Sequence, residues 1–327
     1  MEERSFTRLG RAVGVVGLGA WQFGADWGTV SETTALETLD AAVTAGVTFV
    51  DTADVYGDGR SEQLIGRYLR SHPDAGLLVA TKMGRRVPQT PEAYTLANFR
   101  QWTDRSRTNL GVDRLDLVQL HCPPSAVVDS DTVFDALDTL VAEERITGYG
   151  VSVETCDQAL TAIARPGVAS IQIILNALRH KPLEQVLPAA SAAGVGIIAR
   201  VPLASGLLSG RYDERTRFAA DDHRSYNRHG EAFDVGETFS GVDYGVGLAA
   251  VRRLAPLVPE SVTMAQFALR WILDQPGVTV VIPGARDAAQ ARGNAAAAAV
   301  PPLDADTLAA VRTGYDDLIR PQVHDRW

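Results

Sequence analysis

The feature that most constrains the fold of this chain is a regular alternation of short apolar runs with longer segments of helical period. The runs are rich in β-branched residues and short enough to be strands. Such an alternation indicates repeated βα units on a parallel sheet. The runs span residues 13–18, 47–50, 77–81, 115–120, 148–151, 171–175, 195–199 and 278–282. We therefore expect eight parallel strands.

The segments between the runs carry apolar residues at helical spacing. Between Thr33 and Ala45, for example, Ala35, Leu36 and Leu39 fall on one face of a helix. Gly46 and Gly194 each separate such a segment from the next run, where a left-handed helix end suits glycine. The pattern predicts helices over 33–45, 62–69, 132–142 and 183–193, and an extra C-terminal helix over 303–318.

The competing architecture is an open, doubly wound sheet with a phosphate-binding turn after its first strand. That turn needs a third glycine, but Gly17-Leu-Gly19 is followed by Gln22 at the required position, and the acidic Asp51 lies too far along the chain. The 327 residues are about twice the ~150 typical of one domain, and no change in composition separates two halves. We therefore expect an α/β fold in which residues 1–327 form a single (β/α)8 TIM-barrel domain.

Composition excludes several classes of protein. A hydrophobic content of 46% and a charged content of 22% supply a large core. The net charge of −9 disfavours nucleic acid as a partner. No apolar stretch predicts a membrane span or a secretory signal, so we expect a cytoplasmic protein. Two cysteines and scattered histidines predict neither a disulfide framework nor a metal site.

Three consecutive predicted strands are each followed by an ionisable residue. Asp51, Lys82 and His121 come directly after the second, third and fourth runs. The carboxyl ends of the strands of a closed barrel form one rim, so these side chains should converge there. A single polar residue in this position is more often a solvated strand end or a helix cap. Three in succession, with complementary charges, favour a site.

Tyr56 lies on the loop that leaves the second predicted strand, close in sequence to Asp51. It is either an apolar anchor of the loop or a proton donor. A neighbouring ammonium such as Lys82 would lower the pKa of the phenol, and Asp51 would balance the buried lysine. His121 could then bond the carbonyl oxygen that receives the proton. Together these residues predict a site for reducing a carbonyl.

Five spaced motifs resemble the aldo-keto reductases over roughly residues 5–300. They are Asp51-Thr-Ala-Asp-Val-Tyr56-Gly, Thr81-Lys82, Leu120-His121, Gly150-Val-Ser152, and Ile282-Pro-Gly-Ala-Arg286 with Asn294. The resemblance implies a barrel whose floor is closed by a β-hairpin within residues 5–16, so that the first barrel strand begins later than residue 13. It also implies a nicotinamide cofactor at the C-terminal rim and hydride transfer to a small aldehyde or ketone. Tyr56 resembles the general acid, Lys82 and Asp51 the pair that tunes it, and His121 the group that orients the carbonyl.

The resemblance also assigns residues to the cofactor. They are Trp21 near the nicotinamide and substrate, Ser152 and Gln172 at the carboxamide, Arg200 at the nicotinamide face, Pro202, Leu203, Ser205, Gly206 and Arg211 at the pyrophosphate, and Gly284, Arg286, Gln290 and Asn294 at the adenosine end. Arg200 stands where many members carry an aromatic ring, and Gln290 where many carry an arginine that grips the 2′-phosphate. Arg286 could take over that grip. We therefore favour NADP(H), with NAD(H) as the alternative.

Residues 210–244 are polar and glycine-dotted, which predicts a long loop that is a lid, a binding loop or locally disordered. Its Arg217, His223 and Arg224 would suit an anionic substrate, but we favour a solvated loop. Strand alternation would point Cys122 away from the site. Two rival functions are a nicotinamide-sensing regulatory barrel with little turnover and a metal-dependent hydrolase that uses Asp51 and His121. The complete four-residue site favours the reductase.

Overall fold

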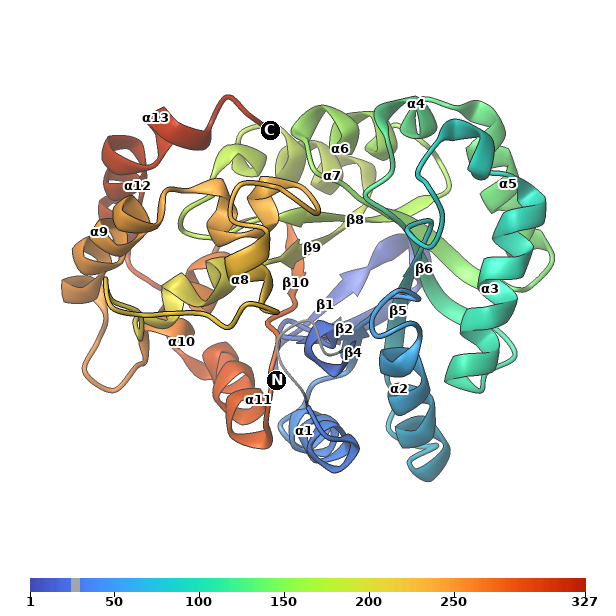
Figure 1. Cartoon of the computed structure of the whole chain (residues 1–327), viewed down its shortest axis with the longest axis horizontal. Coiled ribbons are helices and arrows are strands. Elements are labelled where there is room, and N and C mark those ends of the chain that lie inside the picture. The colour runs from blue at the N-terminus through green and yellow to red at the C-terminus, as the bar shows by residue number, and fades with distance from the viewer. Residues whose placement is uncertain (25–29) are drawn as a thin grey trace.

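A computed structural model describes residues 1–24 and 30–327, and its strands form a closed parallel barrel (Figure 1). In the described part of the chain, eight strands pair in chain order, each parallel to the next. They are β3 (Leu18–Gly19), β4 (Phe49–Asp51), β5 (Leu78–Met83), β6 (Leu115–His121), β7 (Ile146–Ser152), β8 (Val168–Ile174), β9 (Gly196–Arg200) and β10 (Val278–Val281). Parallel bridges from Val16 to Val281 and from Gly19 to Gly284 join the first strand to the last. The predicted (β/α)8 fold is confirmed.

Helices surround the strands on the outside of the barrel (Figure 1). The helices of the described residues are α1 (Glu32–Thr44), α2 (Arg60–Ser71), α3 (Leu96–Leu110), α4 (Ser125–Val128), α5 (Asp131–Ala142), α6 (Cys156–Ile163), α7 (Val186–Ala193), α8 (His223–Tyr226), α9 (Tyr244–Leu254), α10 (Met264–Leu273), α11 (Ala288–Ala295), α12 (Ala305–Leu318) and α13 (Arg320–Val323). The predicted helices correspond to α1, α2, α5, α7 and α12. As expected, Gly46 and Gly194 adopt positive φ, 91° and 68°, at the ends of α1 and α7.

A β-hairpin of β1 (Glu3–Phe6) and β2 (Arg11–Gly14) closes one end of the barrel. Phe6 and Val13 are fully buried and belong to the apolar cluster inside the strands. Gly196 makes room for this plug, because a Cβ there would lie 2.2 Å from a ring carbon of Phe6. The apolar run 13–18 is therefore not one strand, since antiparallel pairing with Arg4 takes Val13 into the hairpin.

The strand pleat sorts the inside of the barrel into an apolar floor and a polar mouth. Every second residue of a strand points inward. Near the hairpin the cluster inside the strands is apolar and includes Phe49, Leu78, Leu117, Ile198 and Val280. Two to four residues further along the same strands come the buried polar residues Asp51, Lys82, Gln119, His121 and Arg200. The sequence places a polar layer at the carboxyl ends of the strands.

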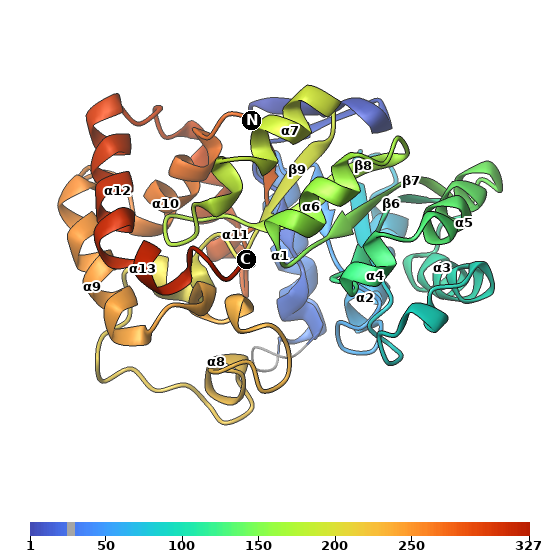
Figure 2. The ribbon, with the colours of Figure 1, turned by 90° about the horizontal axis from the view of Figure 1, so that it is seen from above.

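Residues 210–244 lie at the end of the barrel opposite the hairpin, where Figure 2 shows α8. The predicted loop is ordered by short elements: α8 and the 3₁₀ turns Val235–Glu237 and Phe239–Gly241. Phe239, His223 and Arg224 are buried, so the expectation that the His223 and Arg224 side chains are solvated was wrong. Arg224 pairs with Asp222 at 2.5 Å, and Arg217 is exposed. No helix among the described residues is both long and apolar enough to cross a membrane.

Candidate active site

Lys82 and Asp51 form a buried ion pair at the barrel mouth. The Lys82 Nζ donates to Asp51 Oδ1 at 2.5 Å and to the carbonyl of Thr52 at 2.8 Å. The same Nζ donates to the Tyr56 hydroxyl at 3.2 Å. Both members of the pair are almost fully buried, with 1% and 5% of their side chains exposed. The structure thus brings together three of the four residues predicted for the reaction.

Tyr56 lies half-buried at the rim, between Trp21 and His121. Its ring stacks on Trp21 with the ring centres 5.9 Å apart and meets the edge of His121 at 5.9 Å. Gly24 and Gly57 permit this packing, because a Cβ on Gly24 would lie 2.7 Å from the Tyr56 carbonyl carbon. The fourth predicted residue, His121, therefore faces the same hydroxyl-bearing ring.

The charges around Tyr56 act in opposite directions on its pKa. Burial raises the pKa of Tyr56, Lys82 lowers it, and the net direction is upward. Lys82 lowers the phenol pKa as the sequence predicts, but burial, which that prediction omitted, has the larger effect and makes the net shift upward. The phenol stays protonated at neutral pH. Lys82 reduces the free-energy cost of forming the phenolate within that buried setting.

Lys82 is charged at neutral pH, whereas His121 is neutral. Burial alone would lower the pKa of Lys82, but Asp51 and Tyr56 outweigh it and hold that pKa above its ordinary value. Burial and the cations Arg85, Lys82 and Arg200 hold the pKa of His121 well below its ordinary value. His121 is thus a neutral imidazole, and its Nδ1 has no hydrogen-bond partner among the described residues.

Gln172 and Ser152 extend the polar layer from β7 and β8. The Gln172 amide donates to Asp51 Oδ2 at 2.7 Å and to Gln119 Oε1 at 3.3 Å. The Ser152 hydroxyl donates to Gln172 Oε1 at 3.5 Å. Neighbouring side chains therefore satisfy the buried amide. The Ser152 hydroxyl and the Gln172 carbonyl oxygen are held next to the ion pair.

Cys122 turns toward the site and not away from it as predicted. Its φ of 47° breaks the strand alternation directly after β6. The thiol lies 3.5 Å from the Ser152 hydroxyl and lines the pocket. Burial raises the pKa of this thiol to about 12, so it is a neutral group in the wall.

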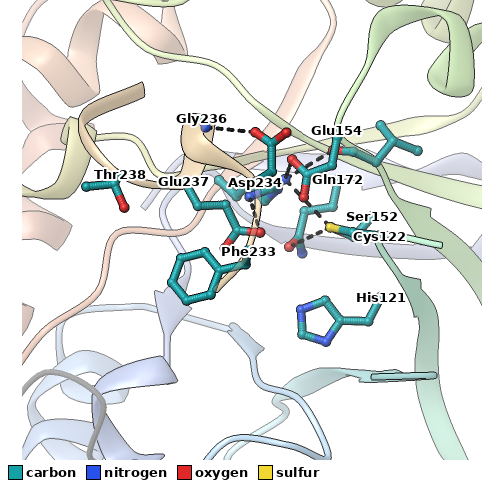
Figure 3. Close-up of polar contacts among 12 residues, drawn as sticks. His121, Cys122, Ser152, Glu154, Gln172, Phe233, Asp234, Gly236, Glu237 and Thr238 are labelled. Carbon is teal, nitrogen blue, oxygen red and sulfur yellow. Dashed lines mark hydrogen bonds and ion pairs between the residues drawn. The ribbon is translucent and has the colours of Figure 1, made fainter. Parts of the chain in front are cut away.

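A pocket of about 610 Å³ opens above Tyr56 and His121. Its lining includes the aromatic rings of Trp21 and Phe233 and the charged side chains of Arg85, Glu154 and Glu237. Figure 3 shows the carboxylates of Glu154 and Glu237 beside Cys122, with the His121 ring nearby. Arg85, Glu154 and Glu237 were not predicted as site residues from the sequence. Glu154 follows the β7 motif closely enough to be found by its spacing, but no local pattern marks Glu237 within its polar segment.

Arg200, predicted to face the nicotinamide, belongs to a buried group of four charges. It pairs with Glu154 at 2.7 Å and lies 3.7 Å from Glu237, and Arg85 reaches the same two carboxylates at 3.4 and 3.1 Å. We call Arg85, Glu154, Arg200 and Glu237 the charge cluster. Because each guanidinium is shared between two carboxylates, the cluster joins three barrel elements to the segment 210–244.

The residues predicted for the pyrophosphate lie on the turn after β9. Ser205 and Gly206 have positive φ, 55° and 96°. The Ser205 hydroxyl donates to the Glu237 carbonyl at 3.0 Å and accepts from the Phe239 amide at 3.1 Å. Pro202 is buried, Leu203 is half-buried and Arg211 is exposed. The turn therefore also anchors the segment that covers the pocket.

The residues predicted for the adenosine end gather at the start of α11. Asn294 donates to the Gly284 carbonyl at 3.1 Å, and the Arg286 amide donates to Gln290 Oε1 at 3.0 Å. The Arg286 side chain is exposed. Burial raises the pKa of Tyr212, and the positive charges of Arg224 and, to a smaller extent, Arg286 act to lower it. A loop with an exposed cation beside a helix N-terminus fits a phosphate group.

The fold and this site define an α/β barrel with a protonated phenol, an ammonium–carboxylate pair and a neutral imidazole at its carboxyl-end rim. The chain belongs to the Aldo/keto reductase family, whose model matches residues 15–315. It is 30% identical over 294 residues to the aldo-keto reductase YhdN of Bacillus subtilis, a match that covers 89% of this chain and 86% of that protein. Family membership makes it an oxidoreductase.

Solved structures share the fold. Aldo-keto reductase AKR11C1 from Bacillus halodurans in its holo form superposes with a TM-score of 0.78 at 24% identity, over 99% of this chain and 100% of that one. An aldo/keto reductase from Klebsiella pneumoniae in complex with NADP and acetate gives 0.71 at 22% identity, over 96% of each chain. A probable voltage-gated potassium channel subunit beta of Arabidopsis thaliana is also similar, with 26% identity over 320 residues and 93% of each chain covered.

Proposed function

We propose that this protein reduces small aldehydes or ketones with NADPH, and that Tyr56 protonates the carbonyl oxygen. The observation that carries the proposal is the hydrogen-bonded chain from the Tyr56 hydroxyl through Lys82 Nζ to Asp51, with His121 against the Tyr56 ring. Tyr56, at the end of this chain of groups, and His121 both line the pocket. A general acid for carbonyl reduction needs a donor hydroxyl, a neighbouring charge that stabilises its anion, and access to the substrate, and Tyr56 has all three.

Each side chain has a distinct part in this reaction. Tyr56 is protonated before the reaction because burial raises its pKa. As its proton moves to the substrate oxygen, the positive charge of Lys82 stabilises the phenolate that forms, and Asp51 keeps Lys82 charged and in place. His121, as a neutral imidazole, donates an N–H to the same oxygen without competing as an acid. In the reverse direction the phenolate takes the proton back.

The residues of the mouth support a nicotinamide dinucleotide as the cofactor. Reduced nicotinamide supplies the hydride when it is bound. The Ser152 hydroxyl and Gln172 carbonyl would bond its carboxamide, and the turn at Ser205 and Gly206 would hold the pyrophosphate. The NADP complex of the Klebsiella relative supports the phosphorylated form of the cofactor. In this chain the exposed Arg286 is the cation placed to meet a 2′-phosphate.

Rapid mixing tests this proposal. A preformed complex with NADPH, deuterated at C4, is mixed with a panel of neutral and charged aldehydes and ketones, and nicotinamide absorbance is followed. We expect at least one carbonyl to be reduced at ~1 s⁻¹ or faster, which is the low end of ordinary turnover. The alcohol product should carry the deuterium. Oxidation slower than ~0.001 s⁻¹ with every compound would contradict the proposal.

A second candidate is a regulatory barrel that binds the cofactor and turns over slowly. The similarity to a probable potassium channel subunit beta favours it. The same mixing experiment separates the two functions, because a sensor would bind NADPH tightly and oxidise it slowly with all substrates. The intact group of Tyr56, Lys82, Asp51 and His121 favours the reductase.

A further inference from the structure

The charge cluster places four largely buried charged side chains next to the proposed nicotinamide site. Arg200 and Glu237 each have 8% of their side chain exposed, Glu154 has 16% and Arg85 has 21%. Two guanidinium groups face two carboxylates. When all four groups are ionised, their formal charges cancel.

The cluster borders the residues that the proposed function assigns to the nicotinamide ring. One Arg200 nitrogen donates to the carbonyl of Val153 at 3.2 Å and lies 3.7 Å from the Cys122 thiol. That thiol is itself 3.5 Å from the Ser152 hydroxyl. Arg200 Nε has no hydrogen-bond partner among the described residues. Within the described part of the chain, Arg200 thus has one unpaired guanidinium nitrogen and lies beside the Cys122 thiol, which lines the pocket.

The two redox states of nicotinamide differ by one charge. The oxidised ring is a cation and the reduced ring is neutral, whereas the rest of the dinucleotide is the same in both. A fixed charge near the ring therefore changes the affinity for one form and leaves the other nearly unaffected. Inside a protein such an effect is far larger than in water, because the effective dielectric constant is lower.

We propose that Glu237 sets the ratio of affinities for oxidised and reduced cofactor, by cancelling the positive charge that Arg85 and Arg200 would otherwise place beside the nicotinamide. The inference rests on the proposed cofactor site. Glu237 lies on the segment 210–244 and contacts neither the Tyr56 phenol nor the Lys82–Asp51 pair. It therefore acts through the electrostatic potential at the nicotinamide and takes no part in the proton transfer. It is a specificity-determining residue for the redox state of the cofactor.

Glu237 suits this role better than Glu154. Burial alone would raise the pKa of Glu237, but Arg85 and Arg200 outweigh burial and lower that pKa to about 2. For Glu154 the net direction is upward, because its burial is reinforced by the neighbouring Glu237. Of the two carboxylates, Glu154 gains a proton first as pH falls. Glu237 therefore keeps its charge to lower pH than Glu154 does.

The test measures dissociation constants for NADP⁺ and NADPH at pH 7.5 by calorimetry or fluorescence, without substrate. Glu237→Gln removes the charge and keeps the shape. We expect the ratio of the NADP⁺ constant to the NADPH constant to rise about tenfold, which is ~30 mV in the potential of the bound two-electron couple. Arg85→Gln removes a positive charge from the same cluster and should lower the ratio.

The double variant Arg85→Gln/Glu237→Gln separates charge from shape. It restores a neutral cluster, so the ratio should return to within twofold of the wild type although two ion pairs are lost. The matched control is Glu143→Gln. Glu143 also pairs with two arginines, Arg100 and Arg145, but lies before β7 at the far end of the barrel. It should leave the ratio unchanged.

The outcomes distinguish this inference from the proposed function. An unchanged ratio in Glu237→Gln, equal weakening of both forms, or a double variant that stays shifted would overturn the role of Glu237. Failure of the wild type to bind either cofactor would instead refute the proposed cofactor. If Glu237→Gln does not fold, Arg85→Gln provides the test, because it is expected to change the ratio in the opposite direction. An unchanged ratio in Arg85→Gln would contradict the inference equally.

Discussion

At the scale of single residues, the site depends on a lysine that the fold holds charged inside the barrel. Lys82 is 1% exposed and keeps its proton because Asp51 lies 2.5 Å away. Gln119 and Gln172 both donate to the other oxygen of Asp51. The carboxylate is thus fixed from two sides. Removing one member of such a pair leaves an uncompensated buried charge.

Asp51→Asn should lower the free energy of unfolding by about 3 kcal/mol, because Lys82 loses its counter-charge. Urea denaturation measures the change. Glu214→Gln removes the carboxylate of an exposed pair with Arg252 and serves as the control, with an effect below ~1 kcal/mol. A loss below ~1 kcal/mol in Asp51→Asn would show that the pair is not a coupled buried unit.

The pH dependence of reduction follows from the directions of two pKa shifts. The reaction needs a protonated phenol, and burial raises the Tyr56 pKa above its ordinary 10.0. The single-turnover rate should therefore hold up to about pH 10 and fall only above it. His121 stays neutral because its pKa lies well below 6.5, so it should add no inflection between pH 6 and 8. Burial raises the pKa of Asp54, two residues before Tyr56, to about 7, so an inflection from Asp54 should disappear in Asp54→Asn. An inflection near pH 6.5 that persists in Asp54→Asn would assign His121 a charged role.

At the scale of elements, the hairpin and the strands fit through small residues. A Cβ on Gly196 would clash with the Phe6 ring. Gly196→Ala should therefore destabilise the protein by about 1–3 kcal/mol. Gly293→Ala is the matched control, because Gly293 lies in α11 with nothing near its missing Cβ. It should be neutral or stabilise the protein by up to ~1 kcal/mol, owing to helix propensity. Equal changes in the free energy of unfolding in the two variants would contradict the claim that Gly196 makes room for the Phe6 ring.

The elements that the sequence predicts well are those with a repeating pattern. Apolar runs and periodic faces identify seven of the barrel strands to within a few residues, and the pleat explains why Asp51, Lys82 and His121 share one interior layer. The exceptions have local causes. Val13 is drawn into the hairpin, and the positive φ of Cys122 reverses its direction. Neither the partner with which a strand pairs nor the φ angle of a single residue changes the hydrophobic periodicity of the sequence.

At the scale of the whole molecule, the proposed cofactor site joins segments far apart in the chain. The turn after β9 meets the segment 210–244 where the Ser205 hydroxyl donates to the Glu237 carbonyl, and Arg286 at the start of α11 acts electrostatically on Tyr212 of that segment. Contacts between residues this far apart in the chain form only when the barrel closes. Local sequence therefore could not show that Glu237 and Arg85 lie together in the charge cluster. The resemblance to the aldo-keto reductases identified the motifs and their order along the chain, but it did not predict the charge cluster.

Cofactor binding should stabilise the whole barrel because it bridges those segments. At 100 times the dissociation constant, NADPH should add about 2.7 kcal/mol. For a chain of this length that is about 4 °C in Tm. NADH at the same concentration should give a smaller rise, and Arg286→Ala should reduce the difference. Thermal denaturation monitors both. Equal shifts with NADH and NADPH in the wild type would contradict the role of Arg286.

The most direct test of the proposed chemistry is single turnover by Tyr56→Phe with bound NADPH. The variant keeps the ring that stacks on Trp21 and loses the hydroxyl bonded to Lys82. We predict unchanged NADPH affinity and a rate of hydride transfer reduced far more than tenfold, a barrier increase well above ~1.4 kcal/mol. A variant that binds NADPH and keeps more than about a tenth of the wild-type rate would contradict Tyr56 as the proton donor.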